Sequence, residues 1–160
     1  MSSRAVMELQ ASDPIERSLY ERDFYTWTRE QVAALTEGRL QDLDLVNLAE
    51  EVADMGSEKF NQLAGAFRVI LLHMLKWDHQ PERRSRSWVT SIRTQRIDAA
   101  YVLGDNPGLK SRVAEAVERG YSIARIRAAG ETGVPEKAFP TTCPYTENEI
   151  MSRPFEWPEA

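Results

Sequence analysis

The sequence predicts an all-α protein, a single-domain bundle of about five helices on which a proline-rich C-terminal tail packs. Apolar residues recur at steps of three and four through most of the chain, which is typical of helices with one buried face. No stretch alternates apolar and polar residues as a half-buried strand does. The 160 residues match the size of one ordinary domain, and five prolines after Gly133 exclude further long helices.

The first helix is expected to start at one of two places. The segment Asp13-Pro14-Ile15-Glu16 combines a capping aspartate, an early proline and a glutamate that completes a capping box. Alternatively the helix starts at Asp23, with Leu19-Tyr20 as an extended lead-in. In both cases it ends near Gly38, and residues 1–12 form a flexible arm. Its spaced residues are Tyr20, Phe24, Trp27, Gln31, Ala34 and Leu35.

A second helix and the central helix follow. Either Asp42 or Asp44 caps the second helix, and Gly56-Ser57 is expected to break the chain before the central one. The central run becomes apolar almost all round between Val69 and Leu75, so we expect other helices to cover it on several sides. Pro81 ends it. Its apolar positions are Phe60, Leu63, Ala64, Phe67, Ile70, Leu71, Met74, Leu75 and Trp77.

Two more helices and the tail complete the predicted fold. Ser85 or Ser87 caps the next helix, and the last long helix ends near Gly130. Gly120 interrupts the pattern of this last helix, where it permits a close helix crossing or marks a kink. The bundle therefore spans 13–134 and the irregular tail spans 135–160, with one short helical turn at its Thr-Glu-Asn-Glu segment. The residues expected to anchor the tail are Phe139, Tyr145, Ile150, Phe155 and Trp157.

Ordered motifs run through nearly the whole chain. They are DFYTW at 23–27, NLAEEVADMG at 47–56, LLHMLKW at 71–77, QPERRSRSW at 80–88, SIRTQR at 91–96, NPGL at 106–109, ETG at 131–133 and FPTTCPY at 139–145. From about Leu19 to Phe155 the chain resembles the bacterial family called Domain of Unknown Function 29. This resemblance implies a helical fold and no particular activity.

Charge and cysteine content restrict the function. The net charge of −5 argues against a protein that coats nucleic acid generally, although a local basic patch remains compatible with it. The single cysteine, Cys143, excludes an internal disulfide and fits a reducing compartment. The N-terminus lacks the apolar core of a secretory signal, and no run is long enough to cross a membrane. We therefore expect a cytoplasmic protein without a membrane span.

The first candidate site combines acidic residues with a histidine. Glu51, Asp54 and His73 would suit a divalent metal, or a general base with its orienting partner, if the second and central helices packed antiparallel. Alternatively, His73 hydrogen-bonds a carboxylate or carbonyl group and holds two helices in register. A paired Glu-x-x-His repeat is absent from the sequence, so a di-iron bundle is not indicated.

The second candidate site is an arginine cluster with a tryptophan. Guanidinium forks and an indole ring can bind a phosphate, a nucleotide or RNA. Alternatively, the arginines form ion pairs with acidic residues such as Asp54 and Glu58. The candidate ligand-binding residues are Arg83, Arg84, Arg86, Arg93, Arg96 and Trp88.

Three functions are compatible with these patterns. The leading hypothesis is a non-enzymatic module that binds a protein partner or forms a homo-oligomer, because the helical body carries no recognisable catalytic set. The second is a metal- or histidine-assisted hydrolase or nuclease that acts on a phosphate-containing substrate. The third is a nucleic-acid-binding module, which the net charge disfavours. Cys143 is expected to be a packed residue rather than a nucleophile, and the sequence assigns no cofactor.

Overall fold

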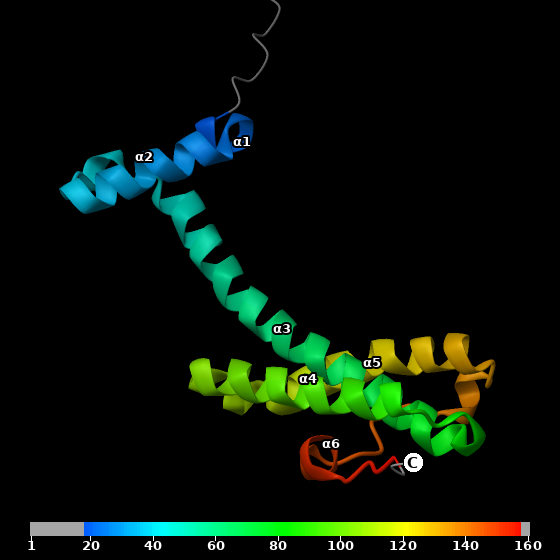
Figure 1. The fold of residues 1–160 in the computed structure, drawn as a ribbon. Helices are drawn as coiled ribbons and strands as arrows, with labels where there is room; N and C mark the ends of the chain where they lie inside the picture. Colours follow the sequence, from blue (N-terminus) through cyan, green and yellow to red (C-terminus); the bar gives the residue numbers. More distant parts are fainter. Residues whose placement is uncertain (1–17, 158–160) are drawn as a thin grey trace, which may run out of the picture. The chain divides into compact units, whose positions relative to one another are not determined.

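The computed structural model describes residues 18–157, and every regular element within them is helical. Six α-helices and four short 3-10 helices follow one another, and no strand occurs in this described range (Figure 1). The predicted all-α fold is confirmed. The chain divides into two compact units, Met1–Val52 and Ala53–Ala160. The expected arm at 1–12 and the helix start at Asp13 lie outside the described residues and stay predictions.

The first unit contains two helices and the beginning of a third. α1 (Leu19–Arg22) is a single turn, and α2 (Phe24–Glu37) begins at Asp23, whose carboxylate caps it. α2 ends at Gly38, which adopts the left-handed φ of 71° that glycine takes without strain. The predicted start at Asp23 and end at Gly38 are confirmed. The lead-in is a helical turn rather than the expected extended segment.

Two side chains on the buried face of α2 form hydrogen bonds with residues that follow the helix. The 3-10 helix η1 (Leu40–Asp42) leads to Asp44, whose carboxylate accepts a hydrogen bond from the Trp27 indole N–H at 3.2 Å. The backbone N–H of Asp44 donates to the side-chain oxygen of Gln31 at 2.7 Å. Of the 35 described residues in this unit, only Trp27, Gln31 and Ala34 are buried, so its core is very small.

α3 (Leu45–His79) is one continuous helix of 35 residues. The predicted break at Gly56-Ser57 is wrong, because a glycine inside a helix costs only about 1 kcal/mol and a serine costs less. No proline interrupts the helix. Its start agrees with one of the two predicted caps, since the Asp44 carboxylate accepts a hydrogen bond from the backbone N–H of Asn47 at 3.3 Å.

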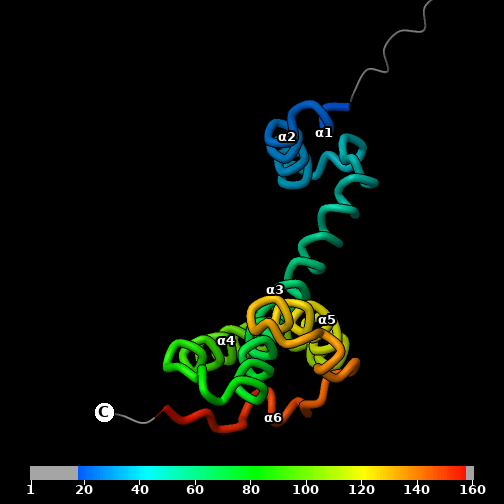
Figure 2. The backbone as a smooth tube through the Cα atoms, turned by 90° about the vertical axis from the view of Figure 1, so that its right-hand side faces the viewer, coloured from blue at the N-terminus to red at the C-terminus, as the bar shows by residue number. Residues whose placement is uncertain are grey.

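The second unit is built around the C-terminal half of α3. α4 (Arg86–Asp105) and α5 (Val113–Thr132) lie on opposite sides of it (Figures 1 and 2). Ile70, Leu71 and Met74 have no exposed surface, which confirms that this apolar run forms the centre of the bundle. None of the helices in the described part of the chain is long and apolar enough to span a membrane.

Gly120 allows α5 to approach α3 very closely. A Cβ atom at this position would lie 2.8 Å from the backbone nitrogen of Arg68 and 2.9 Å from the carbonyl oxygen of Ala64. Both distances are shorter than any real Cβ contact tolerates. Of the two interpretations of Gly120 from the sequence, the close crossing is therefore the observed one.

The connections between the helices differ slightly from the predicted ones. η2 (Pro81–Arg83) follows α3, and Ser85 takes the cap position of α4. η3 (Pro107–Arg112) is a 3-10 helix that precedes α5. α5 ends at Gly133, whose φ is 71°, rather than near Gly130. Gly130 has an ordinary helical conformation, so the left-handed terminus falls on the next glycine along the chain.

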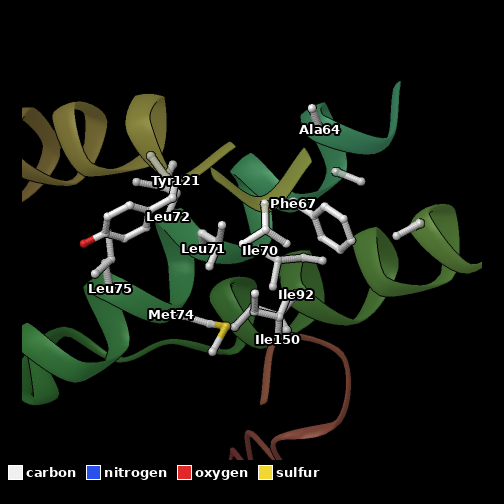
Figure 3. Packing of buried hydrophobic residues seen from close by; sticks show 14 of the residues in the cluster. Ala64, Phe67, Ile70, Leu71, Leu72, Met74, Leu75, Ile92, Tyr121 and Ile150 are labelled. Atoms are coloured by element: carbon white, nitrogen blue, oxygen red, sulfur yellow. The ribbon is translucent and has the colours of Figure 1, made fainter. Parts of the chain in front are cut away.

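The tail packs on the second unit, as predicted. It contains η4 (Glu136–Ala138) and α6 (Glu147–Ser152), whose predicted Thr146 cap forms a full capping box. Phe139 and Ile150 are fully buried or nearly so. Figure 3 shows Ile150 next to Ile92 of α4 and Met74 of α3, so the tail completes the core.

Candidate functional site

Asp54 and His73, two of the three residues proposed for the first candidate site, do not converge. Asp54 and His73 lie nineteen residues apart on the continuous helix α3, which places them about 28 Å apart along its axis. Glu51 belongs to the first unit, where its carboxylate accepts a hydrogen bond from the Tyr20 hydroxyl at 2.6 Å. Among residues 18–157, no three His, Cys, Asp or Glu side chains form a group that could hold a metal ion.

His73 instead lies beside an ion pair between buried Lys76 and exposed Glu131. Lys76 Nζ is 2.6 Å from Glu131 Oε2 and 4.7 Å from the ring centroid of Trp88, whose centroid is 6.4 Å from that of His73. Within the described residues, the buried Nδ1 of His73 has no hydrogen-bond partner. Burial lowers the pKa of His73, and the positive charge of Lys76 lowers it further, against the opposing effect of Glu131. The imidazole is therefore neutral at pH 7.

Lowering the pH below about 6.5 is expected to destabilise the second unit through His73. The unfolded imidazole takes up a proton near that pH, whereas the lowered pKa in the folded state resists protonation. The unfolded state then binds more protons, so the free energy of unfolding falls as the pH decreases. Denaturant titrations at about pH 7.5 and about pH 5.5 measure this loss.

The His73→Phe variant is expected to show a smaller pH dependence than the wild type, because the titrating group is gone. His79→Phe is the matched control, since it leaves His73 in place. If both variants lose stability between the two pH values as the wild type does, His73 is not the responsible group.

Two of the candidate arginines have structural roles. Arg84 Nε donates a hydrogen bond to the carbonyl oxygen of Trp77 at 2.9 Å, and its guanidinium carbon lies 4.7 Å from the Trp77 ring centroid. Arg96 donates to three carbonyl groups at the end of α6, those of residues 149, 150 and 153, at 3.1, 2.7 and 2.9 Å. Burial lowers the pKa of Arg96, and nearby Arg153 lowers it further. Arg96 thus holds the tail by capping a short helix.

Two other candidate arginines line a groove. Arg86 and Arg93 stand seven residues apart on α4, with Thr90 between them on the same helix face. Together with residues of the C-terminal segment they line a groove of about 850 Å³. Within residues 18–157, the side chain of neither arginine makes a hydrogen bond or an ion pair. No ion pair joins them to Asp54 or Glu58 in the same unit, in contrast to the alternative considered from the sequence.

The opposite wall of the groove comes from the C-terminal segment. Phe155 is buried against the Trp77 ring, with ring centroids 5.5 Å apart, whereas Trp157 remains 40% exposed. The guanidinium carbons of Arg96 and Arg153 lie 5.4 and 5.0 Å from the Phe155 ring centroid. The charge of Arg153 is paired with that of Asp78, whereas Arg96 bonds to carbonyl groups and leaves its positive charge near this wall. Among the described residues that line the groove, Glu156 is the acidic one.

The remaining candidates have no shared site. Arg83 ends η2 and is exposed, and its side chain makes no hydrogen bond or ion pair to any described residue. Trp88 lies half-buried beside Lys76. The thiol of Cys143 is half-buried, 3.6 Å from the carbonyl oxygen of Tyr145, and burial raises its pKa. A raised pKa keeps the sulfur protonated, so a nucleophilic thiolate is not favoured.

The sequence interpretation missed a polar clamp at the end of α3. The Asp78 carboxylate accepts hydrogen bonds from Arg153 Nη2 at 2.6 Å, from Arg153 Nη1 at 2.9 Å and from the Tyr145 hydroxyl at 2.8 Å. Burial by itself would raise the pKa of Asp78, but the hydrogen bonds from Arg153 and Tyr145 bring it below its ordinary value. No local pattern joins residues 67 and 75 positions apart, so only the fold reveals this clamp.

The first unit carries an apolar surface that its own residues do not cover. On α2, Phe24, Tyr25, Val32 and Leu35 are exposed by 48%, 74%, 57% and 53%. Their spacing places them on one face of the helix, beside the buried face of Trp27. We call these four residues the α2 face. The sequence shows the helical spacing of these residues. It does not show which of the two adjacent apolar faces of the helix is buried.

More apolar side chains are exposed in the same unit. In its 35 described residues, eight large hydrophobic side chains are exposed and three residues are buried. A chain of this length rarely folds without an additional constraint or a partner. The exposed residues besides the α2 face are Leu40, Leu45, Val46 and Val52.

Comparisons with known proteins identify a family and nothing further. A family model described as "Domain of unknown function DUF29" matches residues 19–156, which is nearly the whole chain. Neither a curated protein nor a solved structure matches. The resemblance inferred from the ordered motifs is confirmed.

Proposed function

Since the chain belongs to the family described as Domain of unknown function DUF29, which names no activity, we propose a function from its own surfaces: a non-enzymatic interaction module that pairs with a second copy of itself. The supporting observation is the imbalance in the first unit, where large apolar side chains are mostly exposed. Contiguous exposed apolar surface of this kind is typical of protein interfaces.

A second copy fits the α2 face in shape. The face runs from Phe24 at one end of α2 to Leu35 near the other. When two such helices pair antiparallel around a two-fold axis, Phe24 of each faces Leu35 of the other, and both faces are covered over their whole length. A two-fold interface of this sort needs only one self-complementary patch.

The exposed apolar area of the first unit is of the same order as the area buried in a typical protein interface. Eight large side chains, most of them more than half exposed, offer several hundred Å² of surface, against roughly 800 Å² per partner in a standard interface. At about 25 cal/mol per Å², covering this surface offsets a substantial part of the cost of association. Pairing would thus provide the core that the first unit lacks.

The full-length protein is expected to sediment as a dimer, and Val32→Glu combined with Leu35→Glu is expected to make it monomeric. The two introduced carboxylates would have to be desolvated in the interface, which costs far more than the lost apolar contacts. Sedimentation equilibrium measures the mass, and circular dichroism checks that the helix content is unchanged.

The matched control is Ile126→Glu, which changes an equally exposed isoleucine on α5 in the second unit. This variant is expected to remain dimeric. A wild-type protein that stays monomeric up to millimolar concentration would overturn the proposal, and so would a dimer that persists in the double variant.

A further inference from the structure

The groove between α4 and the C-terminal segment has the chemistry of a ligand site. We infer that it binds a nucleoside phosphate, either a free nucleotide or a nucleotide unit within a single strand. This inference concerns the second unit and is independent of the pairing proposed for the first. Three features of the groove carry it: two arginines whose side chains bond to no described residue, an exposed indole, and Glu156 as the one carboxylate among the described lining residues.

The α4 wall supplies the phosphate-binding groups. Arg86, Thr90 and Arg93 occupy positions i, i+4 and i+7, so two guanidinium groups flank one hydroxyl along the same helix face. Arginine binds phosphate oxygens with two parallel N–H donors. The Thr90 hydroxyl donates to the backbone carbonyl of Arg86 at 3.1 Å, so the phosphate donors of this wall are the two guanidinium groups. The side chains of Arg86 and Arg93 are bonded to no described residue, so their donors are free for a ligand.

These two arginines contrast with their neighbours on the same segment. Arg84 and Arg96 donate hydrogen bonds to backbone carbonyl groups and so stabilise the fold. The side chains of Arg86 and Arg93 make no such bonds to described residues, and both line the groove. The nearby Arg96 bonds to neutral carbonyl groups and raises the positive potential around the groove, whereas the charge of Arg153 is paired with that of Asp78.

The opposite wall supplies a flat apolar surface. Trp157 is 40% exposed although it lines the groove, and an exposed indole face is a platform on which a nucleobase stacks. Such stacking contributes roughly 1–3 kcal/mol per base and tolerates any base. The groove volume of about 850 Å³ falls in the range of small-molecule sites.

Glu156 explains why the ligand carries a sugar or an amino group as well as a phosphate. A carboxylate at the edge of an otherwise basic groove would only weaken the binding of a bare anion. It accepts hydrogen bonds from ribose hydroxyl groups or from a base amino group. A nucleoside phosphate would therefore contact the groups of both walls, whereas inorganic phosphate would contact only the arginines of α4.

The test is calorimetric titration of the full chain with four probes: adenosine monophosphate, adenosine, inorganic phosphate and a short single-stranded oligonucleotide. Adenosine monophosphate is expected to bind at least tenfold more tightly than adenosine or inorganic phosphate, with quenching of tryptophan fluorescence. Tighter binding of the oligonucleotide, falling steeply with salt, would identify a strand as the source of the nucleotide. Comparable binding of the oligonucleotide and the monophosphate would identify the free nucleotide.

Variants separate the groove from nonspecific attraction. Arg86→Ala combined with Arg93→Ala, and separately Trp157→Ala, are each expected to weaken binding at least tenfold without changing the helix content. Arg83→Ala is the matched control, because the Arg83 side chain also bonds to no described residue but does not line the groove. The inference is overturned if no probe binds, if inorganic phosphate binds as tightly as the nucleotide, or if Arg83→Ala weakens binding as much as the groove variants.

Discussion

Replacing Gly120 with alanine is expected to destabilise the second unit by about 2 kcal/mol or more. The added methyl group would lie 2.8 and 2.9 Å from backbone atoms of α3. Backbone atoms in the middle of a long helix cannot rotate away as a side chain can, so α5 must shift as a whole and loosen the packing. The higher helix propensity of alanine offsets only about 1 kcal/mol of this cost.

Gly65→Ala is the matched control for this substitution. Gly65 lies on α3 one residue from the same crossing, but a Cβ atom there would meet nothing within 4 Å. The control is therefore expected to stabilise the protein by up to about 1 kcal/mol, since alanine favours the helix. Denaturant titrations of both variants measure the difference, and equal stabilities would mean that the close crossing of α3 and α5 does not exist in solution.

Replacing Phe139 with alanine is expected to cost about 3–5 kcal/mol of unfolding free energy. Phe139 is 1% exposed, and its ring centroid lies 4.6 Å from that of His79. Its removal would leave a cavity between the tail and the bundle, and its apolar surface would no longer be buried. The loss is measured as a lower denaturant midpoint.

Tyr101→Ala is the control for a deleted ring, because Tyr101 is 68% exposed on α4 in the same unit. Its expected effect is within about 0.5 kcal/mol. If Phe139→Ala were equally mild, the tail would contribute nothing to the core, and the buried positions of the tail would have to be reconsidered.

Local patterns predicted most helix positions, and tertiary packing decided the rest. The apolar run around Ile70 predicted the central helix correctly, because nearly every position on it is covered. The glycine and serine at 56–57 predicted a break that does not occur. Both residues are common at helix ends, but inside a helix they cost only about 1 kcal/mol or less, so a helix whose later residues are buried in the core continues through them.

The candidate site was less predictable than the fold. The sequence shows a cluster of arginines, but it does not distinguish Arg84 and Arg96, which bond to carbonyl groups, from Arg86 and Arg93, which line a groove. That distinction depends on the tail, whose position is set by contacts more than 50 residues apart. Trp157 was expected as a tail anchor and is partly exposed instead.

The cap that Arg96 provides for α6 has an electrostatic consequence. Its three acceptors are neutral carbonyl groups, so they orient the guanidinium group without cancelling its charge. A lysine could not reproduce the three-way fork, and an arginine does not lose its proton at physiological pH. Arg96 is thus a permanent cation fixed at one spot, and it would accelerate the arrival of anions by long-range attraction that added salt diminishes.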